Sequence, residues 1–473
     1  MRKMKIKFII TAIFFSLTLV LILIGLNNIK TKSQSAIGKL TKEDSLQLTK
    51  LRELEENLDN DLEEGKVISS DNKILWSKSN DGYEDTFGLV GNLRDGSQLS
   101  NNTITYKYKD VLLPNMKQYK FQDGVESLIG STGDIKLSLD YSLNNMIYKY
   151  MKKKVSNASA LLVDIKTGGT IASVSLPSIK PTKSVELESL QDGSLTNKNL
   201  SGVCFPGSTQ KIATTSVLAE IMGDEITTLS HNCNGNFQLK NGGSIKCITS
   251  QGNKKISSAI GTSCNSFFAW ATQDILDHNK SKAVACYKKL GYVVGDDATV
   301  EYQKIDRLSR TKSISQYAAN GSVNSTWSAI GEQSVRVNAY DMTNLVAAIF
   351  NDGEYAEPYI IQKISYKNGK EWNHKIEHKR ILTSKAAKIV YNEWKNGFDT
   401  YYNLNPKIKI AKTGTAEIEK KEKGKTVKKD SSLLLGCINI KGRDVAFFIN
   451  IEDYKSANIK ASDVAEYIAE NIG

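Results

Sequence analysis

The hydrophobic pattern of the chain begins with one long apolar run. From Phe8 to Leu26 every residue is uncharged and most are apolar. A helix rises about 1.5 Å per residue, so this run nearly matches a hydrocarbon core of about 30 Å. Basic residues precede it, and Ile24–Asn28 lacks the small-x-small pattern of a cleavage site. We therefore expect a retained single-pass signal anchor over 8–26, rather than a cleaved signal peptide, with residues 1–7 in the cytoplasm and the rest outside it.

The next segment, 27–133, mixes charged stretches with short apolar ones. Four leucines spaced three or four residues apart form one stripe of a helix within 39–65, and Thr41–Asp44 can cap that helix. Residues 66–130 hold short alternating runs, such as Thr103–Tyr108, between clusters of turn-forming residues, which indicates strands. The pattern predicts a small membrane-proximal pedestal or stalk domain over 27–133.

The remainder, 134–473, carries stronger secondary-structure signals. A helix is expected at Tyr141–Lys154, followed by a hairpin whose turn contains two adjacent glycines. The hairpin strands are Ala158–Asp164 and Thr170–Val174; later segments are predicted as helices at 257–276, 338–351 and Ala461–Glu470, and as strands at Ile408–Ala416, Ser432–Ile440 and Asp444–Ile451. Strands, then helices, then strands again predict an α+β or α/β domain with a mixed or antiparallel sheet packed on helices.

The charge of the chain restricts its partners. Lys and Arg number 63 against 51 acidic residues, which gives a formal net charge of +12. Most of the positive charge is lysine scattered along the chain, without an arginine-rich motif, so nucleic-acid binding is a poor interpretation. The charge is either solubilising or suited to an anionic surface polymer or membrane. The polar stretch 418–430 lies between two predicted strands and is expected to form a solvated hairpin tip.

The six cysteines leave two alternatives open. Cys233 and Cys247 flank a glycine-rich turn, Lys240–Gly243, and could face each other across a hairpin. A disulfide is one outcome, because the anchor places this segment outside the cytoplasm. A metal site with His231 is the other, although the spacing matches no zinc-finger motif. Cys204 and Cys264 are expected to pack in the core.

A serine and a lysine three residues apart carry the strongest chemical signal. Ser208 and Lys211 follow Phe205-Pro206-Gly207 and open an apolar run of small residues, which predicts a buried helix. Residues at this spacing share one helix face. A buried lysine loses preference for its charged form, so it can accept a proton from the serine hydroxyl and make it a nucleophile. The same spacing at Ser70–Lys73 and Ser309–Lys312 lies in polar or basic surroundings without a buried helix.

Two further motifs follow along the chain. Ser263-Cys264-Asn265 precedes Lys412-Thr413-Gly414-Thr415, and the second motif continues an alternating strand. A glycine within a strand marks the close approach of a ligand or another backbone. Lys412 is therefore expected to act as a fixed cation at the edge of a site, with Thr413 as a hydrogen-bonding neighbour. The other Lys-Thr-Gly, at 166–168, falls in the predicted hairpin turn, where turn geometry explains it.

These three motifs, in this order, resemble the signature of penicillin-binding proteins and serine β-lactamases. The flanking segments strengthen the resemblance to class B penicillin-binding proteins, which are peptidoglycan D,D-transpeptidases. Phe205–Lys211 and Lys412–Glu417 are similar to the family's versions, as is Ile330–Val337, where Glu332 and Ser334 depart from Ile-Gly-Gln-Gly. The resemblance covers about 135–473 and implies a transpeptidase domain of the penicillin-binding-protein/β-lactamase fold over 134–473.

The resemblance also implies a role for each site residue. Ser208 would attack the carbonyl of a D-Ala-D-Ala stem peptide, with Lys211 as the base. Ser263 and Asn265 would hold Lys211 and the substrate amide. The substrate's carboxylate would bind Lys412 and Thr413, beside Gly414, and the N–H groups of Ser208 and Thr415 would form the oxyanion hole. Neither a metal nor an organic cofactor is expected for this reaction.

The implied partners are stem peptides, β-lactams, the plasma membrane and a polytopic membrane glycosyltransferase, since no glycosyltransferase domain is evident in the chain. A serine β-lactamase is the alternative, although no convincing Glu-x-x-x-Asn segment for deacylation follows Asn265. A D,D-carboxypeptidase or a non-catalytic β-lactam sensor would carry the same motifs. The stage of wall synthesis and the acceptor amine stay open.

Overall fold

The structure is a computed structural model that describes residues 63–93, 101–113, 132–181, 190–191, 193–194, 197–240, 242–295, 299–317, 322–422 and 425–472. These residues belong to one unit, Asp61–Gly473. The anchor expected at 8–26 and the stalk helix expected within 39–65 fall almost wholly outside the described residues, so both stay predictions. Within the described part of the chain, no helix is both long and apolar enough to span a membrane.

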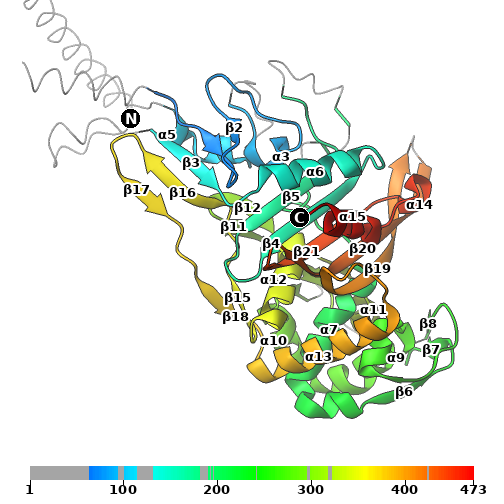
Figure 1. The fold of residues 1–473 in the computed structure, drawn as a ribbon. Helices are drawn as coiled ribbons and strands as arrows, with labels where there is room; N and C mark the ends of the chain where they lie inside the picture. Colours follow the sequence, from blue (N-terminus) through cyan, green and yellow to red (C-terminus); the bar gives the residue numbers. More distant parts are fainter. Residues whose placement is uncertain are drawn as a thin grey trace, which may run out of the picture. The chain divides into compact units, whose positions relative to one another are not determined.

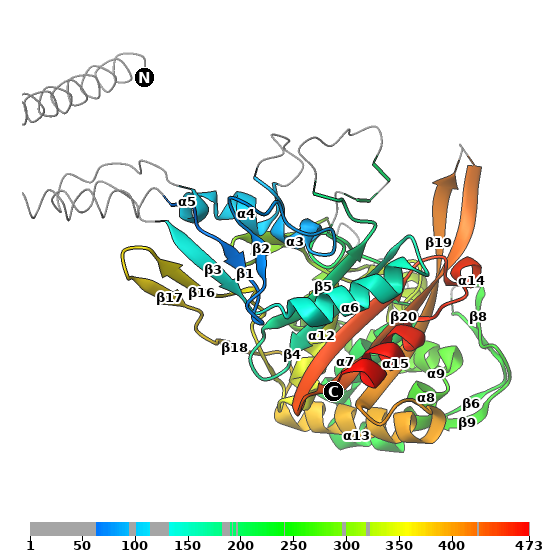
Figure 2. The ribbon, with the colours of Figure 1, turned by 45° about the horizontal axis from the view of Figure 1, so that its top comes forward.

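Five strands form the central sheet in the order β19-β20-β21-β4-β5, and every neighbouring pair is antiparallel. The bounds are β4 Ala158–Asp164, β5 Thr170–Leu176, β19 Ile408–Glu422, β20 Lys425–Ile440 and β21 Arg443–Ile451. Helices α6 (Tyr141–Lys152) and α15 (Ala461–Asn471) cover one face of this sheet, and α12 (Ala339–Phe350) covers the other (Figure 1 and Figure 2). Because both faces are covered, every residue of β4 and β5 is buried.

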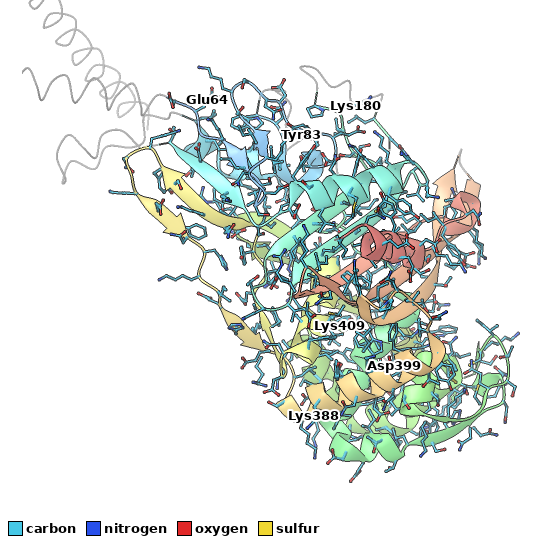
Figure 3. All side chains as sticks on the ribbon, viewed as in Figure 1. Glu64, Tyr83, Lys180, Lys388, Asp399 and Lys409 are labelled. Atoms are coloured by element: carbon cyan, nitrogen blue, oxygen red, sulfur yellow. The ribbon has the colours of Figure 1, made fainter. Side chains whose placement is uncertain are left out.

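The second half of the domain is mainly helical. Its elements are α7 Gln210–Met222, α8 Ile256–Gly261, α9 Asn265–Ala271, α10 Lys280–Lys289, α11 Ser322–Ile330 and α13 Ser384–Tyr401. Helix α7 is buried on all sides from Gln210 to Ala219, as expected for a helix that is apolar all round. Helix α13 is amphipathic instead: Lys388 and Asp399 are exposed along it (Figure 3). Trp394 of the same helix is buried. Helix α13 is not among the helices predicted from the sequence.

A second sheet joins segments that are distant in sequence. Its order is β17-β16-β3-β1-β2, with the bounds β1 Val67–Ile68, β2 Ile74–Trp76, β3 Gly133–Leu137, β16 Ile361–Tyr366 and β17 Glu371–Asn373. Strand β3 pairs parallel with β1 and antiparallel with β16. The sheet therefore draws strands from both sides of the predicted boundary between 133 and 134.

Two predicted elements need correction. The run Thr103–Tyr108, predicted as a strand, holds helix α4 (Ile104–Lys107), and α5 (Lys109–Leu112) follows it. The buried residues of this segment include Ile104, Tyr108 and Val111, whose helical spacing outweighs the alternation. The single helix predicted at 257–276 is divided into α8, α9 and a short π-helix, Thr272–Leu276.

The other predicted strands and helices of the domain are confirmed within a few residues, except that strands β19 and β20 reach further than expected. They pair as far as Glu422 and Lys425, so most of 418–430 is paired strand.

Candidate active site

A tight turn places Ser208 at the start of α7. Gly207 has a positive φ of 51° and begins the short 3-10 helix Gly207–Thr209. Its N–H donates to the carbonyl of Gly331 at 3.0 Å. A Cβ atom at Gly207 would lie 2.4 Å from the carbonyl oxygen of Thr415. Only glycine fits this approach, which brings the turn against strand β19.

The side-chain amine of Lys211 connects two of the predicted motifs. Its Nζ lies 2.9 Å from Ser208 Oγ, 2.6 Å from Asn265 Oδ1, and 2.8 Å and 3.2 Å from the carbonyl oxygen and Oγ of Ser263. Lys211 is fully buried. The structure therefore brings Ser208, Lys211, Ser263 and Asn265 together at one nitrogen atom.

The protonation of Lys211 follows from this setting. Burial, with a further contribution from the charge of Lys412, lowers the pKa of Lys211 to about 7. A neutral amine has two N–H donors and one lone pair. Two of its neighbours can only accept: the carbonyl of Ser263, and Oδ1 of Asn265, whose amide is oriented by donating Nδ2–H to the carbonyl of Lys246 at 2.9 Å. If they take both donors, the lone pair is left for a hydroxyl proton, as a general base requires.

The loop between α8 and α9 sets the position of the Ser-x-Asn motif. Ser263 has a positive φ of 57°, which breaks the helix and turns the chain. Cys264 is fully buried and caps α9, its sulfur accepting the N–H of Phe267 at 3.4 Å. Ser263 carries the only positive φ among the described non-glycine residues of the three motifs. The sequence, which predicts a continuous helix over 257–276, carries no signal for this conformation.

The Lys-Thr-Gly motif lies on β19, the edge strand of the central sheet. Lys412 is fully buried, which lowers its pKa to about 7. Its Nζ donates to the carbonyl of Thr413 at 2.8 Å and lies 3.4 Å from the hydroxyl of Tyr402. Thr413 itself is exposed. A buried cation therefore lies behind an exposed hydroxyl, an arrangement that suits an anionic ligand.

Tyr402 belongs to this group, and sequence reasoning missed it. Its hydroxyl lies 2.9 Å from Thr413 Oγ1 and accepts the backbone N–H of Thr413 at 3.3 Å. Burial raises the pKa of Tyr402, so the hydroxyl keeps its proton. Tyr402 directly follows α13, and nothing in its spacing links it to the three motifs. Only the packing of α13 beside β19 reveals the contact.

We expect Tyr402→Phe to weaken recognition of an anionic ligand more than it slows acylation. The change keeps the ring but frees Thr413 Oγ1 and removes a neighbour of Lys412. The loss of one hydrogen bond predicts a rise in the apparent dissociation constant of about threefold to tenfold. Stopped-flow acylation over a range of penicillin concentrations separates binding from the chemical step. A lower limiting rate of acylation with an unchanged dissociation constant would contradict this role.

The backbone of β19 also points toward Ser208. The N–H of Thr413 points away from β20, toward Tyr402. Alternate residues of a strand direct their N–H groups to the same side, so the N–H of Thr415 also points to the free edge. That nitrogen lies 3.0 Å from a Cβ built at Gly207, and a Cβ at Gly414 would lie 2.7 Å from the carbonyl oxygen of Pro206. The segments that carry the N–H groups of Ser208 and Thr415 are thus in direct contact, as an oxyanion hole built from both groups requires.

A cluster of thiols borders the Ser-x-Asn motif. The sulfurs of Cys233, Cys247 and Cys264 lie within 4.8 Å of one another. The separations are 3.6 Å for Cys233 and Cys247, and 3.9 Å for Cys247 and Cys264. A hydrogen bond from Cys264 lowers the pKa of Cys247 to about 5 and raises that of Cys264.

All three cysteines are free, and thiolates at this spacing could hold a thiophilic metal ion such as Zn²⁺. The predicted metal ligand His231 is engaged elsewhere: its Nε2 lies 2.8 Å from Ser266 Oγ. A metal ion at these thiols would therefore have Cys264, and not His231, as its third ligand. The disulfide and the metal site both stay predictions.

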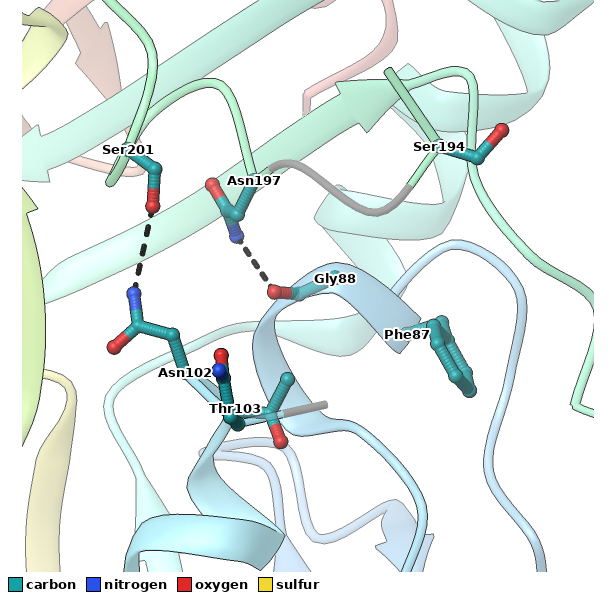
Figure 4. A pocket seen from close by; sticks show the side chains of 8 residues that line it. Phe87, Gly88, Asn102, Thr103, Ser194, Asn197 and Ser201 are labelled. Atoms are coloured by element: carbon teal, nitrogen blue, oxygen red, sulfur yellow. Dashed lines mark hydrogen bonds between the residues drawn. The ribbon is translucent and has the colours of Figure 1, made fainter. Parts of the chain in front are cut away.

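A small cavity lies apart from the motifs. It measures about 40 Å³ and is lined by three segments, mostly through polar side chains such as Asn102, Asn197 and Ser201, together with Phe87 (Figure 4). Asn197 donates to the carbonyl of Gly88 at 3.2 Å. The lining holds no acidic, basic or imidazole side chain that could act as a general base toward its hydroxyl groups.

The comparison with protein families decides the assignment. The model of the penicillin-binding protein transpeptidase domain matches residues 158–472. The chain belongs to this family. The match covers the motifs at Ser208, Ser263 and Lys412, and it confirms the penicillin-binding protein family predicted from them. The domain is a serine-type D,D-transpeptidase, an acyltransferase. A search of curated proteins found no match.

Solved structures share the fold. The ceftriaxone acyl-enzyme of penicillin-binding protein A from Mycobacterium tuberculosis superposes with a TM-score of 0.69 at 16% identity, covering 88% of this chain and 99% of that one. A D,D-transpeptidase domain from Eggerthella lenta gives 0.65 at 18%, covering 87% and 98%. PBP2 from Pseudomonas aeruginosa gives 0.63 at 15%, covering 87% and 95%. At such identities the likeness supports the fold alone.

Proposed function

We propose that this penicillin-binding protein cross-links peptidoglycan by forming an acyl-enzyme on Ser208 with D-Ala-D-Ala stem peptides, and that β-lactams acylate the same serine. The observation that carries the proposal is the position of Lys211 Nζ, 2.9 Å from Ser208 Oγ and bonded to both residues of the Ser-x-Asn motif. A buried neutral lysine at that position can activate a serine without histidine.

During acylation one proton moves from Ser208 to Lys211 and then to the leaving group. Ser208 Oγ attacks the carbonyl carbon of the penultimate D-Ala while its proton passes to Lys211. The N–H groups of Ser208 and Thr415 bind the oxyanion that forms. When the C–N bond breaks, the proton passes from Lys211, directly or through the hydroxyl of Ser263, to the leaving nitrogen of the terminal D-Ala. The ester on Ser208 then reacts with an amine of a second stem peptide, which restores the hydroxyl.

Recognition of the substrate rests on the edge of β19. The terminal carboxylate of the stem peptide binds the exposed hydroxyl of Thr413, and the charge of Lys412 behind it favours an anion. Because Gly414 has no side chain, the strand stays within contact distance of the Ser208 turn. Asn265 Nδ2 donates a hydrogen bond to the backbone carbonyl of Lys246. This bond fixes the orientation of the Asn265 side chain before the substrate amide binds.

The membrane context is part of the proposal. The apolar run 8–26 and the basic residues before it support a single-pass anchor in the plasma membrane, with a cytoplasmic N-terminus and the catalytic domain outside. A class B architecture leaves glycan polymerisation to another protein, so a polytopic membrane glycosyltransferase is the proposed partner.

The fate of the acyl group tests the function. We expect intact-mass spectrometry after a penicillin pulse to show an adduct that persists for many minutes. We also expect a thioester stem-peptide mimic to acylate the protein and be transferred to an added D-amino acid. Rapid return to the unmodified mass would favour the β-lactamase, and acylation without any transfer or hydrolysis of stem peptides would favour the sensor.

A further inference from the structure

A basic cavity lies between elements that carry none of the three motifs. It has a volume of about 220 Å³ and lies among the end of α10, strands β11 (Tyr302–Ile305) and β12 (Leu308–Thr311), helix α12, and strands β15 (Glu354–Ala356) and β18 (His378–Arg380). The charged residues of its lining are Lys288, Lys289, Arg310, Lys312, Asp341 and Lys379. Five cations thus face one carboxylate.

The guanidinium of Arg310 is the most informative group of this lining. Its side chain is 2% exposed, although it is charged at every physiological pH. Nη2 donates to Gln303 Oε1 at 2.8 Å, and Nη1 lies 2.8 Å from Asp341 Oδ1. Neither Nε nor Nη1 forms a hydrogen bond with the described residues, although Nη1 forms the ion pair with Asp341. A buried donor on a charged group is costly to leave unpaired, so it points to a missing acceptor.

Asp341 does not neutralise the cavity. Its Oδ2 accepts the backbone N–H of Ser313 at 2.9 Å and the hydroxyl of Ser313 at 2.7 Å, while Oδ1 faces Arg310. Lys312 pairs with Glu301 at 2.8 Å. Among the described residues, no carboxylate lies within ion-pair distance of the three lysines that remain. Those lysines are Lys288, Lys289 and Lys379, all of them exposed.

We infer that this cavity binds a multiply charged oxyanion of the phosphate class, such as a phosphate monoester or a diphosphate. A buried guanidinium offers a planar set of donors, and lysines supply point charges around it, which together suit a tetrahedral anion. A single carboxylate would leave most of the lining charge uncompensated. The site is independent of the acyl-transfer chemistry, because none of its lining residues belongs to the three motifs.

The test uses the full chain in detergent at low salt, with inorganic pyrophosphate as the probe in isothermal titration calorimetry. We expect one site per chain and a binding constant that weakens steeply with added salt. The variant Lys288→Ala/Lys289→Ala/Lys379→Ala should bind at least tenfold more weakly. The control is Lys280→Ala/Lys282→Ala, which removes two exposed lysines of α10 that do not line the cavity, and it should bind as the wild type does. Its direct counterpart, Lys288→Ala/Lys289→Ala, removes two lysines of α10 that do line the cavity and should bind more weakly.

Two outcomes would overturn the inference: no saturable binding of pyrophosphate by the wild type, or equal loss of binding in the control variant, which would mean a diffuse surface effect. Because only exposed lysines are changed, thermal melting should stay within a few degrees of the wild type. Inorganic phosphate and glycerol phosphate, titrated in parallel, distinguish a preference for a free diphosphate from one for an esterified phosphate. Arg310→Gln is a second variant, expected to abolish binding if it folds.

Discussion

Ser208→Ala is expected to abolish covalent labelling by a fluorescent penicillin. The β-lactam ring opens only when a nucleophile forms an ester with its carbonyl carbon, and alanine has no oxygen with which to form that ester. The side chain of Ser208 lies at the start of α7, beside the glycine turn, and its Oγ is 2.9 Å from Lys211 Nζ. Removing one oxygen atom leaves that turn intact, so the variant should fold.

The measurement is in-gel fluorescence after incubation with the labelled penicillin, with equal circular dichroism spectra as the test of folding. Ser70→Ala is the matched control, because Ser70 precedes Lys73 at the same spacing as Ser208 precedes Lys211. In the structure Ser70 instead bonds the carbonyl of Leu139, with its Oγ at 3.0 Å. Full labelling of Ser208→Ala would overturn the assignment of the nucleophile. Loss of labelling in Ser70→Ala would mean that the assay reports folding.

Lys211→Ala is expected to reduce the acylation rate by about a hundredfold to ten-thousandfold, the range for loss of a general base. The pH dependence of the wild type should report the same group. Burial and the charge of Lys412 lower the pKa of Lys211 to about 7, and the base acts only when it is neutral. The rate should therefore rise as pH increases through about 7. At an ordinary pKa of about 10.4, fewer than about one lysine in a thousand would be neutral at pH 7.

Lys412 should make the acylation rate fall again at higher pH. Its pKa is also lowered to about 7 by burial, and its charge, which favours an anionic ligand, is lost as pH rises. The second-order rate constant of acylation by penicillin should thus follow a bell-shaped dependence on pH. Stopped-flow rates between pH 5 and 9 measure it, and a flat profile in the wild type would contradict the role of Lys211.

Much of the site was predictable from local sequence. Pro206 and Gly207 before an apolar run indicated a buried helix, and that helix required the i, i+3 contact of Ser208 with Lys211. Gly414 in an alternating strand indicated a close approach, which the structure places against Pro206. These inferences succeeded because each depends on interactions within a few residues, where helix and strand geometry alone fix the outcome.

The failures have a common cause. Thr103–Tyr108 alternates like a strand, yet burial of residues such as Ile104 and Tyr108 against the core selects a helix. The continuous helix expected at 257–276 is broken at Ser263, whose φ is positive and whose carbonyl and hydroxyl oxygens both contact Lys211 from another helix. In both segments, tertiary packing outweighs the local preference.

The sequence by itself determined the chemistry of this protein: a serine with a buried lysine, an Asn motif and a strand cation, in the order of the penicillin-binding protein family. Only the tertiary structure decided which groups surround them. Tyr402 meets Thr413 because α13 packs beside β19, and Cys264 joins Cys233 and Cys247 because a hairpin folds over α9. Such contacts join residues from separate elements, and their distances depend on how whole helices and strands pack, which no local pattern encodes.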